Sequence, residues 1–139
     1  MANLFFILLF LLTVGVFIAG FFIIRNLRKP VIPEVASIKQ KWEETQDLAE
    51  SNAELSWKMS VIEADKLMDS VLKQAGMRGE TMGERLRFAV SRYPKIQNVW
   101  EAHILRNDLV HQSDRKITQA EAQKALDRFK QGLKILGAL

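Results

Sequence analysis

The chain has 139 residues, of which 26% are charged and 48% are hydrophobic, and its formal net charge is +4 at neutral pH. It contains no cysteine, which excludes disulfides, thiolate metal sites and cysteine nucleophiles. With only two histidines, a dedicated metal cage is not expected, and we predict neither a metal nor another cofactor. The modest positive charge permits contact with anionic lipid or RNA without requiring either.

The first 24 residues carry no charge. Between Leu4 and Ile24, only Thr13, Gly15 and Gly20 interrupt an aliphatic and aromatic run. As a helix this run would span about 31 Å, close to the hydrocarbon thickness of a bilayer. A cleaved signal peptide is the alternative, but no Lys or Arg precedes the run, which is also too long for one. We therefore predict a retained single-pass anchor.

Three basic residues, Arg25, Arg28 and Lys29, follow the apolar run directly, and none precedes it. The positive-inside bias then predicts an anchor in the inner or plasma membrane with its C-terminal side in the cytoplasm. Within the span, Gly15 and Ala19 form a small-xxx-small pair that would let two spans approach closely. Glycine and alanine are also common in spans that stay monomeric.

Three regions follow from these features. Residues 1–25 are the predicted transmembrane anchor, and residues 26–34 are a basic linker whose Pro30 and Pro33 make a short, stiff break. Residues 35–139 form the predicted cytoplasmic domain, which has a normal size for one domain.

The cytoplasmic domain has helical periodicity throughout and no alternating pattern typical of strands. Three capping-box patterns, Ser51–Glu54, Thr81–Glu84 and Thr118–Glu121, indicate where helices begin. Because the loops between the segments are short, the helices should pack antiparallel. We predict an all-α fold with an antiparallel bundle of four to five helices, over residues 34–50, 51–74, 81–90, 94–111 and 118–136.

The segment "AHILRNDLVHQSD", residues 102–114, holds both histidines of the chain. On a helical projection His103, Asn107 and His111 share one face, with Arg106 at its edge. Burying Arg and His without partners costs on the order of several kcal/mol. Acidic residues, a second protomer or a bound anion must therefore pair with these side chains. In the simplest structural role, Arg106 pairs with a carboxylate such as Asp65, or with Asp69 or Glu84.

The opposite side of the same predicted helix is apolar and carries Leu105 and Leu109. A helix that is apolar on two sides is usually buried on two sides. In a bundle of this size the second contact is expected to be a partner chain, so we predict a homodimer or a higher homo-oligomer with Leu105 and Leu109 at the interface.

The six residues "RNDLVH", Arg106 to His111, resemble the R-x(4–6)-H signature of HEPN domains (higher eukaryotes and prokaryotes nucleotide-binding). In that family a polar residue commonly follows the arginine, and here it is Asn107. HEPN domains are small all-α bundles with the motif in a late helix. The wider string "EADKLMDSVL…GETMGERL…VWEAHILRNDLVH" resembles small, membrane-anchored prokaryotic proteins of this type.

The resemblance implies a metal-independent endoribonuclease, active in stress response or phage defence, whose site is composed across a homodimer. In that role His111 would be the acid or base at the 2′-hydroxyl and the leaving oxygen, and Arg106 would hold the scissile phosphate. Asn107 would orient His111. His103 lies outside the signature, so it is a candidate for substrate contact, although a structural or interface role is favoured.

Two other functions remain open. The HEPN family also includes domains that bind or dimerise without cleaving RNA, so the alternative is a non-catalytic membrane module for oligomerisation or partner recruitment. A membrane oligomer or pore is a third candidate, but the span has no polar face to line an aqueous channel. Basic residues are scattered along the chain, so no DNA partner is expected, while RNA is a candidate partner.

Overall fold

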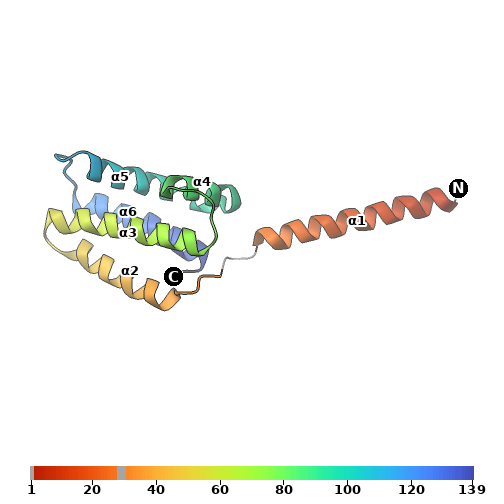
Figure 1. Cartoon of the computed structure of the whole chain (residues 1–139), viewed down its shortest axis with the longest axis horizontal. Helices are drawn as coiled ribbons and strands as arrows, with labels where there is room; N and C mark the ends of the chain where they lie inside the picture. Colours follow the sequence, from red (N-terminus) through yellow and green to blue (C-terminus); the bar gives the residue numbers. More distant parts are fainter. Residues whose placement is uncertain (1, 28–30) are drawn as a thin grey trace.

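This computed structural model describes residues 2–27 and 31–139, and the side chains of residues 4–24 and 31–139. In these residues all regular secondary structure is helical, which confirms the predicted all-α class (Figure 1). The elements are α1 (Ala2–Leu27), α2 (Val35–Glu50), α3 (Glu54–Gln74), α4 (Met82–Arg92), the 3-10 helix η1 (Pro94–Ile96), α5 (Val99–His111) and α6 (Gln119–Leu136).

Helix α1 contains the predicted span. Its segment Leu4–Ile24 has a mean hydropathy of 3.0, and none of this segment is buried by the rest of the described chain. The helix is therefore long and apolar enough to cross a membrane. No heavy atom lies within 4 Å of where a Cβ on Gly15 would be, and Ala19 is exposed. The side chain of Arg25, and all of Arg28 and Lys29, lie outside the described residues.

Helices α2 and α3 form an antiparallel hairpin, and α6 packs along α3 (Figure 1). The start of α6 lies at the hairpin turn, because Gln119 Nε2 donates to the Ala49 carbonyl at 3.1 Å and Ile117 N donates to Glu54 Oε1 at 3.4 Å. The bundle therefore has two ends. The far end holds the α2–α3 turn and the α5–α6 loop, and the anchor end holds the start of α2 and the ends of α3 and α6.

Helix α3 runs through the centre of the bundle, with α6 against it. Helix α6 carries an apolar stripe at helical spacing, and all of its residues are buried: Ala122, Ala125, Leu126, Phe129, Leu133 and Leu136. The matching residues of α3, also fully buried, are Val61, Ala64, Met68, Val71 and Leu72. Burying a side chain such as Phe or Leu contributes about 1.5–3 kcal/mol, so this contact stabilises the bundle strongly.

At Gly132, α6 lies very close to its neighbours. A Cβ at this position would lie 2.7 Å from Val99 Cγ2 of α5 and 3.0 Å from Met68 Cε of α3. Real Cβ atoms do not approach other atoms so closely, so the absence of a side chain lets the start of α5 pack against α6.

Two of the three predicted capping boxes are present. The Thr81 side chain accepts from Glu84 N while the Glu84 side chain accepts from Thr81 N, and Thr118 and Glu121 form the same reciprocal pair. Each box satisfies two backbone donors that the first turn of a helix leaves unpaired. Helices α4 and α6 therefore begin where the sequence predicts.

The capping box predicted at Ser51 is wrong. Helix α3 has Ala53 as its N-cap, with no side-chain cap, and Ser51 is instead the C-cap of α2. Its carbonyl accepts from Trp57 Nε1 at 2.7 Å, and its hydroxyl accepts from Ala53 N at 3.3 Å. The three-residue turn uses Ser51 to end one helix, so Glu54 pairs with Lys58 at 3.1 Å instead of closing a box.

The predicted helix over residues 94–111 is divided into η1 and α5. Pro94 opens the 3-10 turn, and Ile96 is buried in the core. Helix α4 starts beside the middle of α5, since a Cβ on Gly83 would lie 3.7 Å from His103 Nε2. It then runs to the anchor end, and after η1 the chain returns along α5 towards the far end (Figure 1).

Candidate functional site

Asp65 lies at the centre of the polar site, on the side of α3 that faces α5, and is only 2% exposed. His103 Nδ1 is 2.7 Å from Asp65 Oδ1, and Arg106 Nε is 3.3 Å from Asp65 Oδ2. A buried carboxylate is strongly unfavourable unless it is paired and hydrogen-bonded. The pairing that the sequence suggested for Arg106 with Asp65 is present, and it is shared with His103.

Asn107 closes this group into a ring. Arg106 Nη1 donates to Asn107 Oδ1 at 2.9 Å, and Asn107 Nδ2 lies 3.3 Å from His103 Nε2. Both contacts of the His103 ring are satisfied when Nδ1 carries the proton and donates it to Asp65 while Nε2 accepts from Asn107. We call Asp65, His103, Arg106 and Asn107 the Asp65 network.

A second ion pair lies next to the Asp65 network. Arg85 binds Asp69 with two hydrogen bonds, of 2.7 Å and 3.0 Å, and donates to the Gly79 carbonyl at 2.7 Å. Lys73 Nζ is 2.9 Å from the same carboxylate. Burial alone would raise the pKa of Asp69, but the hydrogen bonds from Arg85 and Lys73 outweigh it and lower that pKa. Asp69 is therefore held by Arg85 and not by Arg106.

The two pairs line a polar hollow of about 550 Å³ between α3, α4 and α5. It contains three cations, Lys66, Arg85 and Arg106, and three carboxylates, with Glu80 as the third beside the two aspartates. The charges balance, so within one chain the charged residues that line the hollow give no net positive charge to attract a phosphate. In the described residues no group of three or more His, Cys, Asp or Glu side chains is placed to hold a metal ion.

His111 does not join the Asp65 network. It is the last residue of α5 and is exposed, and it does not line the polar hollow. Five residues along a helix place two side chains about 140° apart, so Arg106 and His111 point in different directions. Asn107 contacts His103 and Arg106, and no hydrogen bond joins it to His111 among the described residues.

Sequence reasoning gave His103 a secondary place, yet this histidine is the one that lies in the network. The missing information was Asp65, which is 38 positions away in the sequence. One local signal was present, because His103 and Asn107 are four residues apart and therefore share a helix face.

Leu105 and Leu109, predicted at an interface, pack inside their own chain. Leu109 is buried in the core, and Leu105 is half-buried against it. The large apolar side chains that α5 leaves exposed are Ile104 and Val110, at 54% and 47%. A partner chain that docks on α5 would meet these two residues first.

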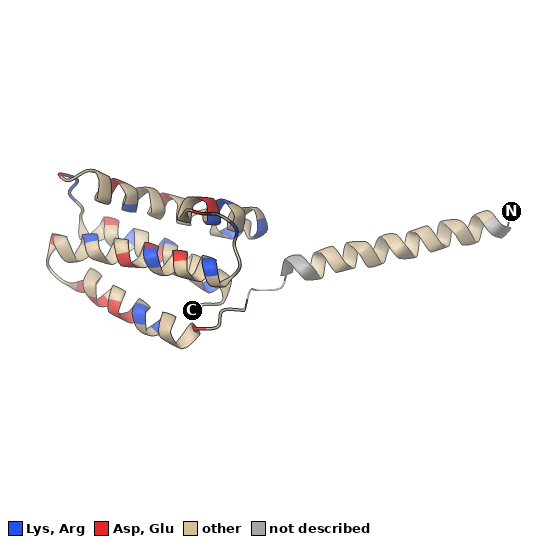
Figure 2. Cartoon of the chain, in the orientation of Figure 1, with Lys and Arg blue, Asp and Glu red and all other residues tan. Residues whose placement is uncertain are grey.

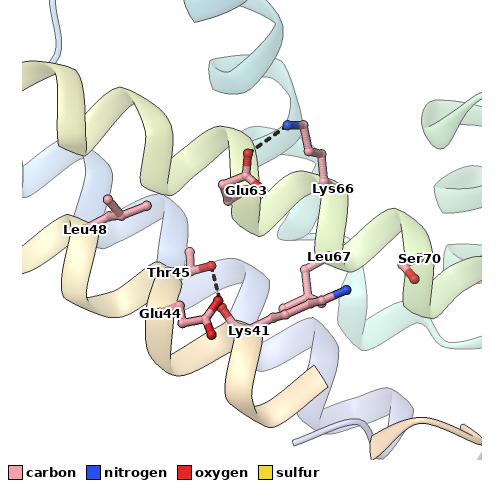
Figure 3. A pocket seen from close by; sticks show the side chains of 8 residues that line it. All are labelled: Lys41, Glu44, Thr45, Leu48, Glu63, Lys66, Leu67 and Ser70. Atoms are coloured by element: carbon pink, nitrogen blue, oxygen red, sulfur yellow. Dashed lines mark hydrogen bonds and ion pairs between the residues drawn. The ribbon is translucent and has the colours of Figure 1, made fainter. Parts of the chain in front are cut away.

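A second hollow, of about 390 Å³, lies between α2 and α3 (Figure 3). Its rim pairs Lys66 with Glu63 at 2.7 Å, and the Thr45 hydroxyl donates to the Lys41 carbonyl within α2 at 2.7 Å. Most of its polar side chains thus contact residues of their own helix, and no histidine lines it. It offers no chemistry comparable to that of the Asp65 network.

Comparison with known proteins finds no significant match to this chain among protein-family models, curated proteins or solved structures. The HEPN resemblance therefore stays a prediction from the motif in α5.

Proposed function

We propose that this protein is a membrane-anchored, HEPN-like helical domain that cleaves RNA without a metal, at a site composed from two copies, in stress response or phage defence. The observation that supports this most is how Arg106 is held. Its guanidinium contacts Asp65 and Asn107 while 26% of the side chain stays exposed. A cation fixed in this way is ready to stabilise charge on a phosphate without reorganising.

The chemistry needs little from the protein, because RNA supplies its own nucleophile. The 2′-oxygen attacks the phosphorus, the bond to the 5′-oxygen breaks, and a 2′,3′-cyclic phosphate results. One histidine accepts the proton of the 2′-hydroxyl and a second donates a proton to the leaving 5′-oxygen. Imidazole suits both steps because its ordinary pKa lies near neutral pH. His111 from each copy would supply this pair, and Arg106 would bind the phosphate.

The proposed mechanism needs a second copy, because of the geometry of α5. Within one chain Arg106 and His111 diverge, so a composite site would place His111 of one copy against Arg106 of the other. The exposed Ile104 and Val110 lie on the same helix, and burying them would contribute to such a contact. The second arginine would also shift the balanced charge of the hollow towards positive.

The test uses the full chain in detergent micelles with a fluorescent single-stranded RNA and excess chelator. Cleavage is expected, and His111→Ala should reduce its rate by about 10²- to 10⁴-fold, the usual contribution of a general acid or base. Lys116→Ala, an exposed residue near the end of α5, is the matched control and should cleave normally. Full cleavage by a folded His111→Ala protein would disprove the nuclease proposal.

The second candidate is a non-catalytic membrane module that assembles copies of itself or recruits a partner. It is favoured by the engagement of Arg106 with Asp65 and by the balanced charge of the hollow. On this proposal Ile104→Glu and Val110→Glu lower crosslinking in membranes while the fold persists, with Ile104→Gln as the uncharged control. Leu109→Glu should unfold the domain instead, because Leu109 is buried. Unchanged crosslinking in both exposed-site variants would contradict assembly through α5.

We also propose the inner or plasma membrane as the location, with the bundle in the cytoplasm and the lipid bilayer as a constant partner. The supporting feature is the apolar segment Leu4–Ile24 of α1, followed in the sequence by Arg25, Arg28 and Lys29.

A further inference from the structure

The charges of the bundle are divided between its two ends. The far half, residues 43–64 and 105–126, has five basic and nine acidic residues. The anchor half, residues 31–42, 65–104 and 127–139, has twelve basic and seven acidic residues. A net charge of +4 for the whole chain therefore conceals a bundle with one positive and one negative end.

The fold creates this separation from stretches that alternate along the sequence. The hairpin places the second half of α3 beside the first half of α2, and the direction of α6 brings its last turns to the same end. Helix α4 and η1 lie there too. Figure 2 shows basic residues (blue) gathered on α4, and acidic residues (red) on the half of α2 away from its start.

Several cations at the anchor end are not neutralised. Lys39, Lys95 and Lys134 are exposed and form no ion pair with any described residue. Arg78 lies over the ring of Phe88, 5.9 Å from its centroid, and so is also held without a carboxylate. Their charge is available to an external anion.

The connection to α1 keeps this end near the membrane. Ile32 is only 7% exposed and packs into the bundle core, so residues 28–31 are the whole of the chain between α1 and the folded domain. Five residue steps reach at most about 18 Å. The electrostatic potential of an anionic bilayer surface falls off over a Debye length of about 8–10 Å. Residues 28–31, which we call the tether, therefore keep the anchor end close to the distance at which this potential acts.

We propose that the anchor end of the bundle is a docking surface for anionic phospholipid headgroups, which orients the domain with its far end away from the membrane. The inference rests on α1 spanning the membrane and is independent of RNA cleavage. Lipid is favoured over RNA as the occupant because the tether confines this surface beside the bilayer. The acidic far half is repelled by the same lipids, which strengthens the orientation.

The absence of cysteine allows a direct test with single labels on the full chain. Ser91→Cys places a fluorophore at the anchor end of α4, and Ser113→Cys places one in the α5–α6 loop at the far end; both positions are exposed. Each protein is reconstituted in neutral phosphatidylcholine nanodiscs or in discs with about 30% phosphatidylglycerol. Energy transfer to an acceptor on the lipid headgroups reports the distance of each label from the surface.

We expect energy transfer from position 91 to be roughly twofold higher in anionic than in neutral discs. This difference should disappear at about 0.5 M salt. Transfer from position 113 should stay low in both. Lys95→Glu with Lys134→Glu should abolish the lipid dependence. Lys116→Glu with Lys124→Glu, which makes the same change of net charge in the far half, should preserve it.

Equal transfer from position 91 in both lipids would overturn the proposal, and so would greater transfer from position 113. Loss of the signal on adding RNA at the same phosphate concentration as the lipid would identify RNA as the preferred ligand and also overturn it. His111→Ala should leave every one of these signals unchanged, so this test and the cleavage assay fail separately.

Discussion

At the scale of single residues, Asp65 decides what the polar side of α5 can do. It is buried, and its two oxygens contact His103 and Arg106. Because Asn107 connects these two cation-capable side chains, the loss of one member leaves the others unpaired in a partly buried site. The same network serves either proposed function, as a rigid support for Arg106 or as a structural clamp between α3 and α5.

Asp65→Asn tests this dependence. It keeps the size of the side chain but leaves Arg106 without its counter-charge, and removing one partner of a buried pair costs about 3–5 kcal/mol. Because Arg106 is about a quarter exposed, a loss of about 3 kcal/mol in the free energy of unfolding is expected, at the lower end of that range. Urea unfolding of the full chain in micelles, followed by tryptophan fluorescence, measures it.

Asp47→Asn is the control for this measurement, since Asp47 is exposed on α2 and forms no ion pair with a described residue. It should change the urea midpoint little. A midpoint for Asp65→Asn equal to that of the control would show that the Asp65 network contributes nothing to stability.

Glu121 makes the stability of the bundle depend on pH, and the sign of this dependence follows from its lowered pKa. The Thr118 backbone N–H donates to its carboxylate at 2.9 Å, and Arg115 and the Thr118 hydroxyl also bind it, which lowers its pKa from 4.5 to about 2. A lowered folded pKa contributes stability above the unfolded pKa, and this contribution is lost as the pH falls from about 4.5 towards 2.

In Glu121→Gln this contribution is absent. The variant should therefore be less stable than the natural chain above about pH 5, and the difference should shrink as the pH approaches 2. Thermal unfolding across this range measures the difference, with Glu50→Gln, an exposed acid of α2 without an ion pair, as the comparison. A difference that stays constant with pH would contradict the assignment.

At the scale of helices, local sequence rules worked where a single helix decides the outcome. The capping residues of α4 and α6 and the apolar stripe of α6 follow from spacing alone. The same rule failed at Ser51, because this serine lies between two helices and ends the first one. Nothing local in "SNAE" distinguishes a serine that starts a helix from one that terminates its predecessor.

The three positions should therefore respond differently to alanine. Thr81→Ala and Thr118→Ala each remove a cap, which typically costs about 1 kcal/mol. Ser51→Ala removes only one weak hydrogen bond of 3.3 Å and should lower the free energy of unfolding by roughly 0.3 kcal/mol. Urea midpoints of the three variants give the comparison, and an equal loss at Ser51 would mean that its hydroxyl caps α3 after all.

At the scale of the whole molecule, composition was enough to predict a long apolar helix, and periodicity was enough to predict an all-helical domain. Two features of the folded chain could not be predicted from the sequence, and the reason is the same for both. The contact between Asp65 and His103 depends on how α3 and α5 are placed side by side, and the division of charge between the ends depends on the directions of all five bundle helices. Both arise from packing between segments far apart in the sequence.

The orientation of the whole chain across the membrane should depend on the basic residues that flank the span. The basic residues after the apolar segment Leu4–Ile24, at 25, 28 and 29, should keep the bundle in the cytoplasm. A single cysteine at position 113 should then react with a membrane-impermeant maleimide only after the cells are opened. Replacing the three basic residues with alanine and adding lysines after Met1 should reverse this, since the bias depends on Lys and Arg flanking the span. Labelling of the natural topology in intact cells would place the bundle outside, and with it exclude a cytoplasmic RNA substrate.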